Sequence, residues 1–311
     1  MTSLEHLQRW KDRGAITGAQ FDTISALLRK DRFSIFVELN ALLYLGVLSF
    51  VAGLGWTIQT YFESLGDAAI LIGLTGLLAA SLYYSFSRVS AWSNERVESP
   101  NMALDYVLYL ACLVFAAEIA YIESRFQLLQ DKRDYYLLLS AVVYFIFAYR
   151  FDNRFVLSLA LSTLAGWFGV KISSFHSISN EPLRMAAVAY GVLIAIGGGL
   201  ISIRDIKRHF FETYLHVAAN VLFIALLSGV LENGFYFAGL IALSGICIYA
   251  GAHFRRFPFL VYGTIYGYIG ISTELLRNIH DFAATLLYII VSGMIVIASL
   301  AILARRLGRE E

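Results

Sequence analysis

Charged side chains are scarce in this sequence. Asp, Glu, Lys and Arg make up 15% of the 311 residues, whereas soluble domains carry about 25%. Hydrophobic residues make up 59%, and they include 23 Phe and 19 Tyr. This composition predicts that most of the chain lies in lipid. A transmembrane barrel would show alternating segments of about ten residues, which the sequence lacks.

Cysteines and catalytic motifs are also scarce. The two cysteines, Cys112 and Cys247, both lie in apolar stretches, which predicts small buried side chains and excludes a disulfide framework. The sequence contains no P-loop, no G-x-S-x-G and no H-E-x-x-H pattern. We therefore expect no enzyme activity and no cofactor. DNA-binding features are absent too, which argues against a nucleic-acid partner.

Ten apolar stretches have the length of membrane spans. A helix needs about 20 residues to cross the hydrocarbon layer of about 30 Å. The predicted fold is an all-α polytopic membrane helix bundle of about ten transmembrane helices over residues 37–304. The predicted spans are 37–62, 67–88, 102–123, 134–150, 153–171, 183–203, 211–231, 234–252, 257–276 and 281–304.

The distribution of charge predicts the orientation of these spans. Lys and Arg are enriched in cytoplasmic loops. If the N-terminus is cytoplasmic, three quarters of the 24 Lys and Arg residues lie on that side. Acidic residues such as Glu123, Asp134 and Glu232 gather at the opposite ends. We therefore expect a multi-pass protein of the bacterial cytoplasmic membrane, with lipids as partners and with both termini, including a tail over 305–311, in the cytoplasm.

Residues 1–36 differ from the rest, because they are polar and carry helix-capping signals. They predict a cytoplasmic hairpin of two short helices, over 3–13 and 18–30. Gly14 would end the first helix in a left-handed conformation, and the T-x-x-Q sequence at 17–20 would form a capping box. Two helices this short bury little surface alone, so we expect them to dock on the membrane face or on a partner protein.

This hairpin also carries a resemblance. The pattern W-K-x-x-G-x-I-T-x-x-Q, followed by the glycine-rich span ALLYLGVLSFVAGLGW, resembles an uncharacterised bacterial family of predicted membrane proteins with a domain of unknown function. The resemblance covers about the first quarter of the chain and implies no known activity. The matching residues are Trp10, Gly14, Ile16, Thr17, Gln20, Gly46, Gly53, Gly55 and Trp56.

The sequence also contains a faint internal repeat. The segments 102–203 and 211–304 align as a parallel duplication of four spans, in which Tyr106 matches Tyr214. Repeats are common in transporters. The alternative is that apolar helices resemble one another by composition alone.

Glu118 is the first of four candidate binding residues. It lies within the span LVFAAEIAYIE, where a charged group costs about 2.5–3.5 kcal/mol and therefore needs a reason. It could bind a cation or a proton in a cavity. Alternatively, its carboxyl group reaches the outer interface or accepts a hydrogen bond from a nearby tyrosine.

His216, Asn220 and Glu274 are the other three candidates. His216 and Asn220 share a helix face at i, i+4, which suits a ligand, or a metal if further ligands exist; the alternative is an interhelical polar contact. Glu274 lies near the outer end, where it could bind a ligand or form an ion pair with Arg277. His280, together with other outer groups, could form a shallow divalent-cation site.

Two inner turns are both basic and aromatic: AYRFDNRF at 148–155 and AHFRRFPF at 252–259. They suit anchoring loops at the membrane interface, and the alternative is a pocket for a headgroup or another anion. The glycines at 73–76, 197–199 and 262–270 predict close helix packing. The run at 197–199 could instead mark a broken span.

These features favour a small-solute or ion transporter. The alternative is a non-catalytic membrane scaffold or regulatory subunit, in which residues 1–36 bind a cytoplasmic partner protein. A transporter should have a polar cavity that reaches Glu118, His216 or Glu274, whereas a scaffold should have a filled interior.

Overall fold

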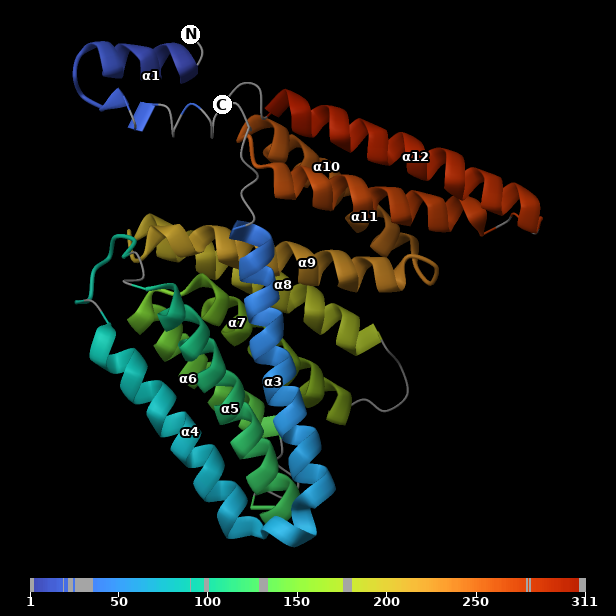
Figure 1. The fold of residues 1–311 in the computed structure, drawn as a ribbon. Helices are drawn as coiled ribbons and strands as arrows, with labels where there is room; N and C mark the ends of the chain where they lie inside the picture. Colours follow the sequence, from blue (N-terminus) through green and yellow to red (C-terminus); the bar gives the residue numbers. More distant parts are fainter. Residues whose placement is uncertain are drawn as a thin grey trace.

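The structure is a computed structural model that describes residues 3–18, 20, 21, 25, 36–89, 91–97, 101–128, 134–175, 181–277, 279 and 281–307. Within these residues it contains helices and no strand, so the all-α class is confirmed (Figure 1). The elements are α1 (Ser3–Asp12), α3 (Phe36–Leu65), α4 (Asp67–Arg88), α5 (Met102–Phe126), α6 (Asp134–Phe151), α7 (Arg154–Phe175), α8 (Glu181–Ile203), the 3-10 helix η2 (Arg208–Phe210), α9 (Phe211–Gly229), α10 (Gly234–His253), α11 (Phe257–Leu276) and α12 (Phe282–Leu307).

Each predicted span corresponds to one of the helices α3 to α12. Among the described residues, eight helices are long and apolar enough to cross a membrane. α7 and α11 are not among the eight. α7 carries Arg154 and Lys171, and α11 carries Glu274.

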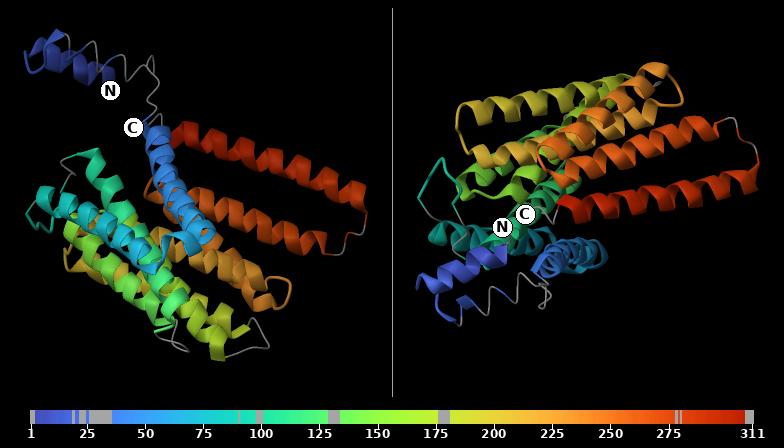
Figure 2. Two further views of the ribbon diagram at one scale, coloured as in Figure 1. Left: turned by 60° about the horizontal axis from the view of Figure 1, so that its bottom comes forward. Right: turned by 90° about the horizontal axis from the view of Figure 1, so that it is seen from above.

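The helices pack most closely as consecutive pairs, namely α4 with α5, α6 with α7, α8 with α9 and α10 with α11 (Figures 1 and 2). One buried cluster includes Tyr144, Leu157 and Phe210, and a second includes Phe223 and Tyr236. In contrast, no residue in the candidate spans of α3 and α12 is buried, which suits contact with lipid. The close pair α6–α7 recurs as α10–α11, four helices later, while the predicted duplication itself stays a prediction.

Small residues explain the close pairing of α10 with α11. A Cβ atom on Gly263 would lie 2.6 Å from the Ser244 carbonyl oxygen, and one on Gly251 would lie 2.5 Å from the Leu260 nitrogen. The packing prediction is therefore confirmed at 262–270. It is wrong at 73–76, where an added Cβ would meet nothing within 4 Å. The broken-span alternative for 197–199 is wrong as well, because α8 is continuous there.

Polar residues fix the ends of several helices. Asp152 adopts φ 57° between α6 and α7, and the side chain of Asn153 accepts a hydrogen bond from the Val156 nitrogen at 2.9 Å. This local cap divides what would otherwise be one long apolar run. It also turns the chain sharply enough for α7 to pack back against α6.

The N-terminal segment follows its sequence signals where the structure describes it. α1 ends at Asp12 and Gly14 has φ +70°. Thr17 and Gln20 exchange hydrogen bonds in the expected capping box: the Thr17 nitrogen donates to Gln20 Oε1 at 2.9 Å, and the Gln20 nitrogen donates to Thr17 Oγ1 at 3.3 Å. Most of the predicted helix at 18–30 and part of the tail at 305–311 lie outside the described residues.

Candidate functional site

Glu118 of α5 accepts a hydrogen bond that joins α5 to α4. Thr75 of α4 donates a hydrogen bond to Glu118 Oε1 at 2.5 Å. The partner is therefore a threonine and not the tyrosine that was one of the alternatives. The carboxyl group is half-buried, and it lines none of the four cavities described among the described residues. Its role in this structure is an interhelical contact.

His216 and Asn220 lie together on the side of α9 that faces α11. The Asn220 amide donates to the His216 carbonyl at 2.8 Å and accepts a long hydrogen bond of 3.4 Å from Tyr266. The His216 ring stacks on Phe259, with centroids 4.7 Å apart. Its Nδ1 is buried and has no hydrogen-bond partner among the described residues. The interhelical contact is therefore present, and one ring nitrogen is left unsatisfied.

Glu274 forms the ion pair expected from its spacing, at 3.6 Å from Arg277. Both side chains are largely exposed. No group of three His, Cys, Asp or Glu residues that could hold a metal occurs within the described residues. His280 lies outside them. The four candidate residues thus occupy three separate places and do not form one site.

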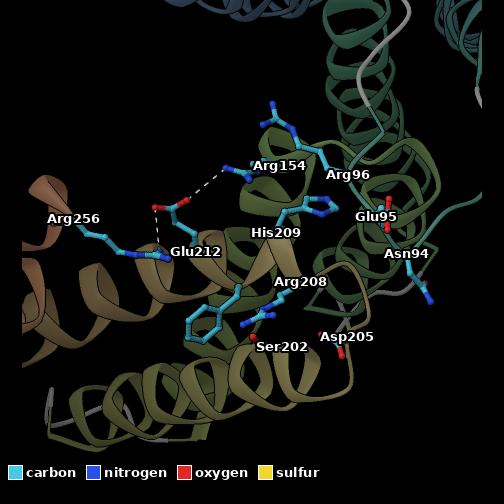
Figure 3. A pocket seen from close by; sticks show the side chains of 11 residues that line it. Asn94, Glu95, Arg96, Arg154, Ser202, Asp205, Arg208, His209, Glu212 and Arg256 are labelled. Carbon is cyan, nitrogen blue, oxygen red and sulfur yellow. Dashed lines mark ion pairs between the residues drawn. The ribbon is translucent and has the colours of Figure 1, made fainter. Parts of the chain in front are cut away.

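A different group of residues does converge on a cavity. Where α6, α8 and α10 end and α7, α9 and α11 begin, the structure has a pocket of about 870 Å³, named here the basic pocket (Figure 3). It joins the two basic turns predicted from the sequence, since Arg154 comes from the first and Arg256 from the second. The lining residues are Asn94, Glu95, Arg96, Arg154, Ser202, Asp205, Arg208, His209, Phe211, Glu212 and Arg256.

Glu212 organises the basic pocket. It lies in the first turn of α9, with Arg154 on one side at 3.6 Å and Arg256 on the other at 3.3 Å, as Figure 3 shows. The contact with Arg154 is too long for a hydrogen bond, and Arg256 Nη1 is buried without a hydrogen-bond partner among the described residues. Both guanidinium groups are therefore held in place with N–H donors to spare.

Arg96 and Arg208 add positive charge to the same cavity. No described carboxylate lies within ion-pair distance of either guanidinium group. Four arginines thus face three carboxylates in the pocket wall, those of Glu95, Asp205 and Glu212. Guanidinium groups match the geometry of phosphate and carboxylate oxygens. The arrangement is therefore suited to an anion.

A buried polar cluster supports the floor of this pocket. Lys207 Nζ lies 3.4 Å from Asp152 Oδ1, and the two side chains are 2% and 4% exposed. His209 contacts the same carboxylate oxygen, and the Val97 nitrogen donates to Asp152 Oδ2 at 2.6 Å. Lys207 also lies over the Trp92 ring at 4.8 Å. Loop 91–97 is thus tied to the turns that present Arg154 and Arg208.

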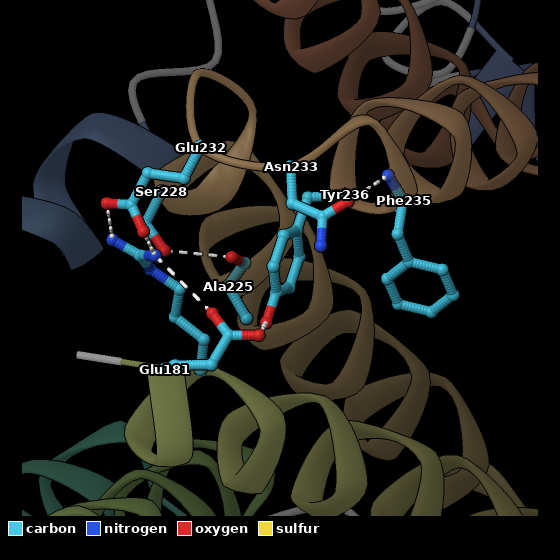
Figure 4. A network of polar contacts seen from close by, with 8 residues as sticks. Glu181, Ala225, Ser228, Glu232, Asn233, Phe235 and Tyr236 are labelled. Carbon is cyan, nitrogen blue, oxygen red and sulfur yellow. Dashed lines mark hydrogen bonds and ion pairs between the residues drawn. The ribbon is translucent and has the colours of Figure 1, made fainter. Parts of the chain in front are cut away.

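The opposite helix ends carry a network that is closed on itself. The Arg184 guanidinium donates to Glu232 at 2.6 Å and lies 3.7 Å from Glu181, which accepts a hydrogen bond from Tyr236 at 2.6 Å (Figure 4). The hydrogen bond from Arg184 lowers the pKa of Glu232 below its ordinary value. Asn233 caps α10 beside this group. These contacts, named here the acidic clamp, join α8 to the turn between α9 and α10.

No sequence motif points to Glu212, Lys207 or Asp152. Each lies in or beside a basic turn. For Asp152 and Glu212, the only hint in the sequence is that a carboxylate stands among several cations. Periodicity could not have shown which distant turns meet. Asp152 stood in the quoted segment AYRFDNRF, but its pairing with Lys207 depends on the packing of α7 beside α8.

Comparison with known proteins finds a family match for the first part of the chain. Residues 8–157 match the model of a family described as "Predicted membrane protein (DUF2157)", a domain of unknown function. The predicted resemblance to a membrane-protein family with a domain of unknown function is confirmed, and the match extends beyond the first quarter of the chain to residue 157. No curated protein and no solved structure matches the chain. The match includes Arg96, Asp152 and Arg154, whereas Glu212 and Arg256 lie beyond it.

Proposed function

We propose that this multi-pass membrane protein binds a small oxyanion, such as a phosphate ester or a carboxylate, at the cytoplasmic mouth of the basic pocket. The observation that carries the proposal is the convergence of Arg154 and Arg256, from two distant turns, on the two sides of Glu212. Glu212 holds the two cations without using their best hydrogen-bonding geometry. An entering anion can therefore accept hydrogen bonds from both.

The proposed role is binding without catalysis, in the manner of a regulatory subunit. Glu118, His216, Asn220 and Glu274 line none of the four cavities described among the described residues. Glu118, Asn220 and Glu274 are all engaged in contacts within or between helices. Trp10 of α1 is 51% exposed, which gives the N-terminal segment an aromatic surface for a cytoplasmic partner protein.

The test is anion binding by the purified protein in nanodiscs of zwitterionic lipid. Inorganic phosphate, pyrophosphate and citrate would be titrated by calorimetry into the unmodified protein and into Arg208→Ala and Arg96→Ala. Losing one charge-assisted hydrogen bond should weaken binding about tenfold or more. The control is Arg204→Ala, an exposed arginine that does not line the pocket, and it should bind as the unmodified protein does. If none of the three anions binds saturably, the proposal is wrong.

One observation favours transport of the anion as a second candidate function. His216 lies one helical turn deeper than Glu212 on α9, with a buried, unsatisfied Nδ1. It would be the next polar group on a path inward from the pocket. Flux of a radiolabelled anion into proteoliposomes, abolished by His216→Ala but retained by Asn220→Ala, would support transport. Binding with no flux would leave the regulatory role.

A further inference from the structure

A second cavity, of about 510 Å³, adjoins the basic pocket and has almost entirely apolar walls. It lies between α8, α9 and α10, and we name it the apolar groove. Leu215, Ala219 and Leu222 line it from α9, and Leu243 and Ala250 from α10. Arg256 is its one charged lining residue. Small alanine side chains leave this space between otherwise well-packed helices.

The apolar groove and the basic pocket share part of their walls. Phe211 and Arg256 line both of them. A single molecule could therefore place a charged group against Arg256 on one side of Phe211 and an apolar group on the other. The change from polar to apolar lining occurs within the first turn of α9.

The length of the groove corresponds to half of a bilayer. Its lining on α9 runs from Phe211 to Leu222, which is about 17 Å at 1.5 Å per residue. One leaflet of the hydrocarbon layer is about 15 Å deep. Ile246, another lining residue, is 63% exposed, so the groove opens to its surroundings. A chain entering from the inner leaflet would meet the groove over its whole length.

We infer that the ligand of this site is an anionic amphiphile, with its oxyanion in the basic pocket and one acyl or alkyl chain along the apolar groove. The inference rests on the proposed function, since it adds a chain to the oxyanion already assigned. Charge complementarity at Arg154, Arg208 and Arg256 selects an anionic headgroup over a zwitterionic one. The chain gains little by leaving lipid for the groove, because both are apolar. The groove therefore selects by shape and the pocket by charge.

The test compares two probes that share a headgroup: glycerol phosphate, which has no chain, and lysophosphatidic acid, which has one. Binding to the full-length protein in detergent would be measured by thermal shift and by native mass spectrometry. Ala250→Leu places a larger side chain in the groove without touching the pocket. It should weaken lysophosphatidic acid binding about tenfold, because the bound chain would overlap the added side chain and have to shift. Glycerol phosphate should bind this variant as it binds the unmodified protein.

The outcomes distinguish failure of this inference from failure of the proposed function. If neither probe binds, the inference is wrong, and the titrations with inorganic phosphate, pyrophosphate and citrate decide the proposed function separately. If both bind and Ala250→Leu weakens neither, the ligand is a chainless anion and the inference is wrong. Lysophosphatidylcholine should bind poorly, and equal binding of this zwitterion would also overturn the inference. If Ala250→Leu fails to fold, Ala219→Leu decides by the same comparison.

Discussion

The two ends of the helix bundle use the same kinds of charged residue in different ways. In the acidic clamp Arg184 is held between Glu181 and Glu232, and every group is engaged within the network. At the other end, Glu212 is shared between two arginines, while further arginines in the same cavity have no carboxylate within ion-pair distance among the described residues. The acidic clamp thus pairs its charges with one another, whereas the basic pocket leaves guanidinium groups available for the anion that we propose.

This difference shows where positive charge stabilises the fold and where it is free to bind. Lys207, beneath the basic pocket, is buried and paired with Asp152, so it belongs with the structural charges. Arg208, the next residue in the sequence, lines the pocket and is exposed. Proximity in sequence therefore does not separate the two roles, whereas burial and pairing do.

The largest expected effect concerns which end faces the cytoplasm. Glu95→Cys at the basic pocket and Leu128→Cys at the opposite end would be labelled in intact cells with a membrane-impermeant maleimide. Since Lys and Arg are retained inside, Leu128→Cys should react at once and Glu95→Cys only after permeabilisation. The native Cys112 and Cys247 are buried and should give little background. Labelling of both positions from one side would refute the predicted topology.

The second-largest expected effect is the loss of thermal stability when the buried cation Lys207 is removed. Lys207→Met keeps most of the side-chain length but leaves the Asp152 carboxylate buried with only His209 and the Val97 amide. Removing one partner of a buried ion pair costs about 3–5 kcal/mol, so thermal unfolding in detergent should occur at a clearly lower temperature. Arg204→Met, at an exposed position in the same turn, serves as the control.

A double variant tests whether the stability lost in Lys207→Met comes from its ion pair with Asp152. Asp152→Asn combined with Lys207→Met removes both charges, and it should recover part of the stability lost in the single variant. Equal melting of Lys207→Met and the control would show that Lys207 is not a structural charge. The contrast between buried and exposed cations at this end would then be wrong.

The helices could be predicted from the sequence, but the basic pocket could be predicted only in part. Apolar length predicts where the helices lie: α4 and α11 match their predicted bounds, whereas α7 and α12 extend beyond theirs. The turns 148–155 and 252–259 were recognised as possible anion sites because basic and aromatic residues alternate there. That they meet at Glu212 depends on how α9 packs between α7 and α11, which no local pattern encodes. The hydrogen bond between Thr75 and Glu118 could not be predicted for the same reason, since the two residues are distant in sequence.

A smaller effect is expected from opening the acidic clamp. Arg184→Met removes the donor that holds Glu232, and since Glu232 is largely exposed, water can replace the lost contact. We expect a drop in melting temperature of a few degrees at pH 7, smaller than that of Lys207→Met, and no change in anion binding at the other end.

The same variant should show a characteristic pH dependence. Arg184 lowers the pKa of Glu232, so the stabilisation is present above the ordinary pKa of glutamate and is lost as the pH falls through the lowered value. The difference in melting temperature between the unmodified protein and Arg184→Met should therefore shrink between pH 7 and pH 3. A difference that is constant over this range would mean that Glu232 does not contribute through its charge.

The smallest effect should come from the ion pair at the end of α11. Arg277 and Glu274 lie 3.6 Å apart, with side chains 54% and 41% exposed. Exposed pairs of this kind contribute about 0.2–1 kcal/mol, so Glu274→Gln should leave the melting temperature nearly unchanged. It should also leave anion binding unchanged, because Glu274 does not line the basic pocket. If Glu274→Gln instead altered binding as strongly as Arg208→Ala, the two ends would be coupled, and the contrast between a self-satisfied end and a ligand-binding end would no longer hold.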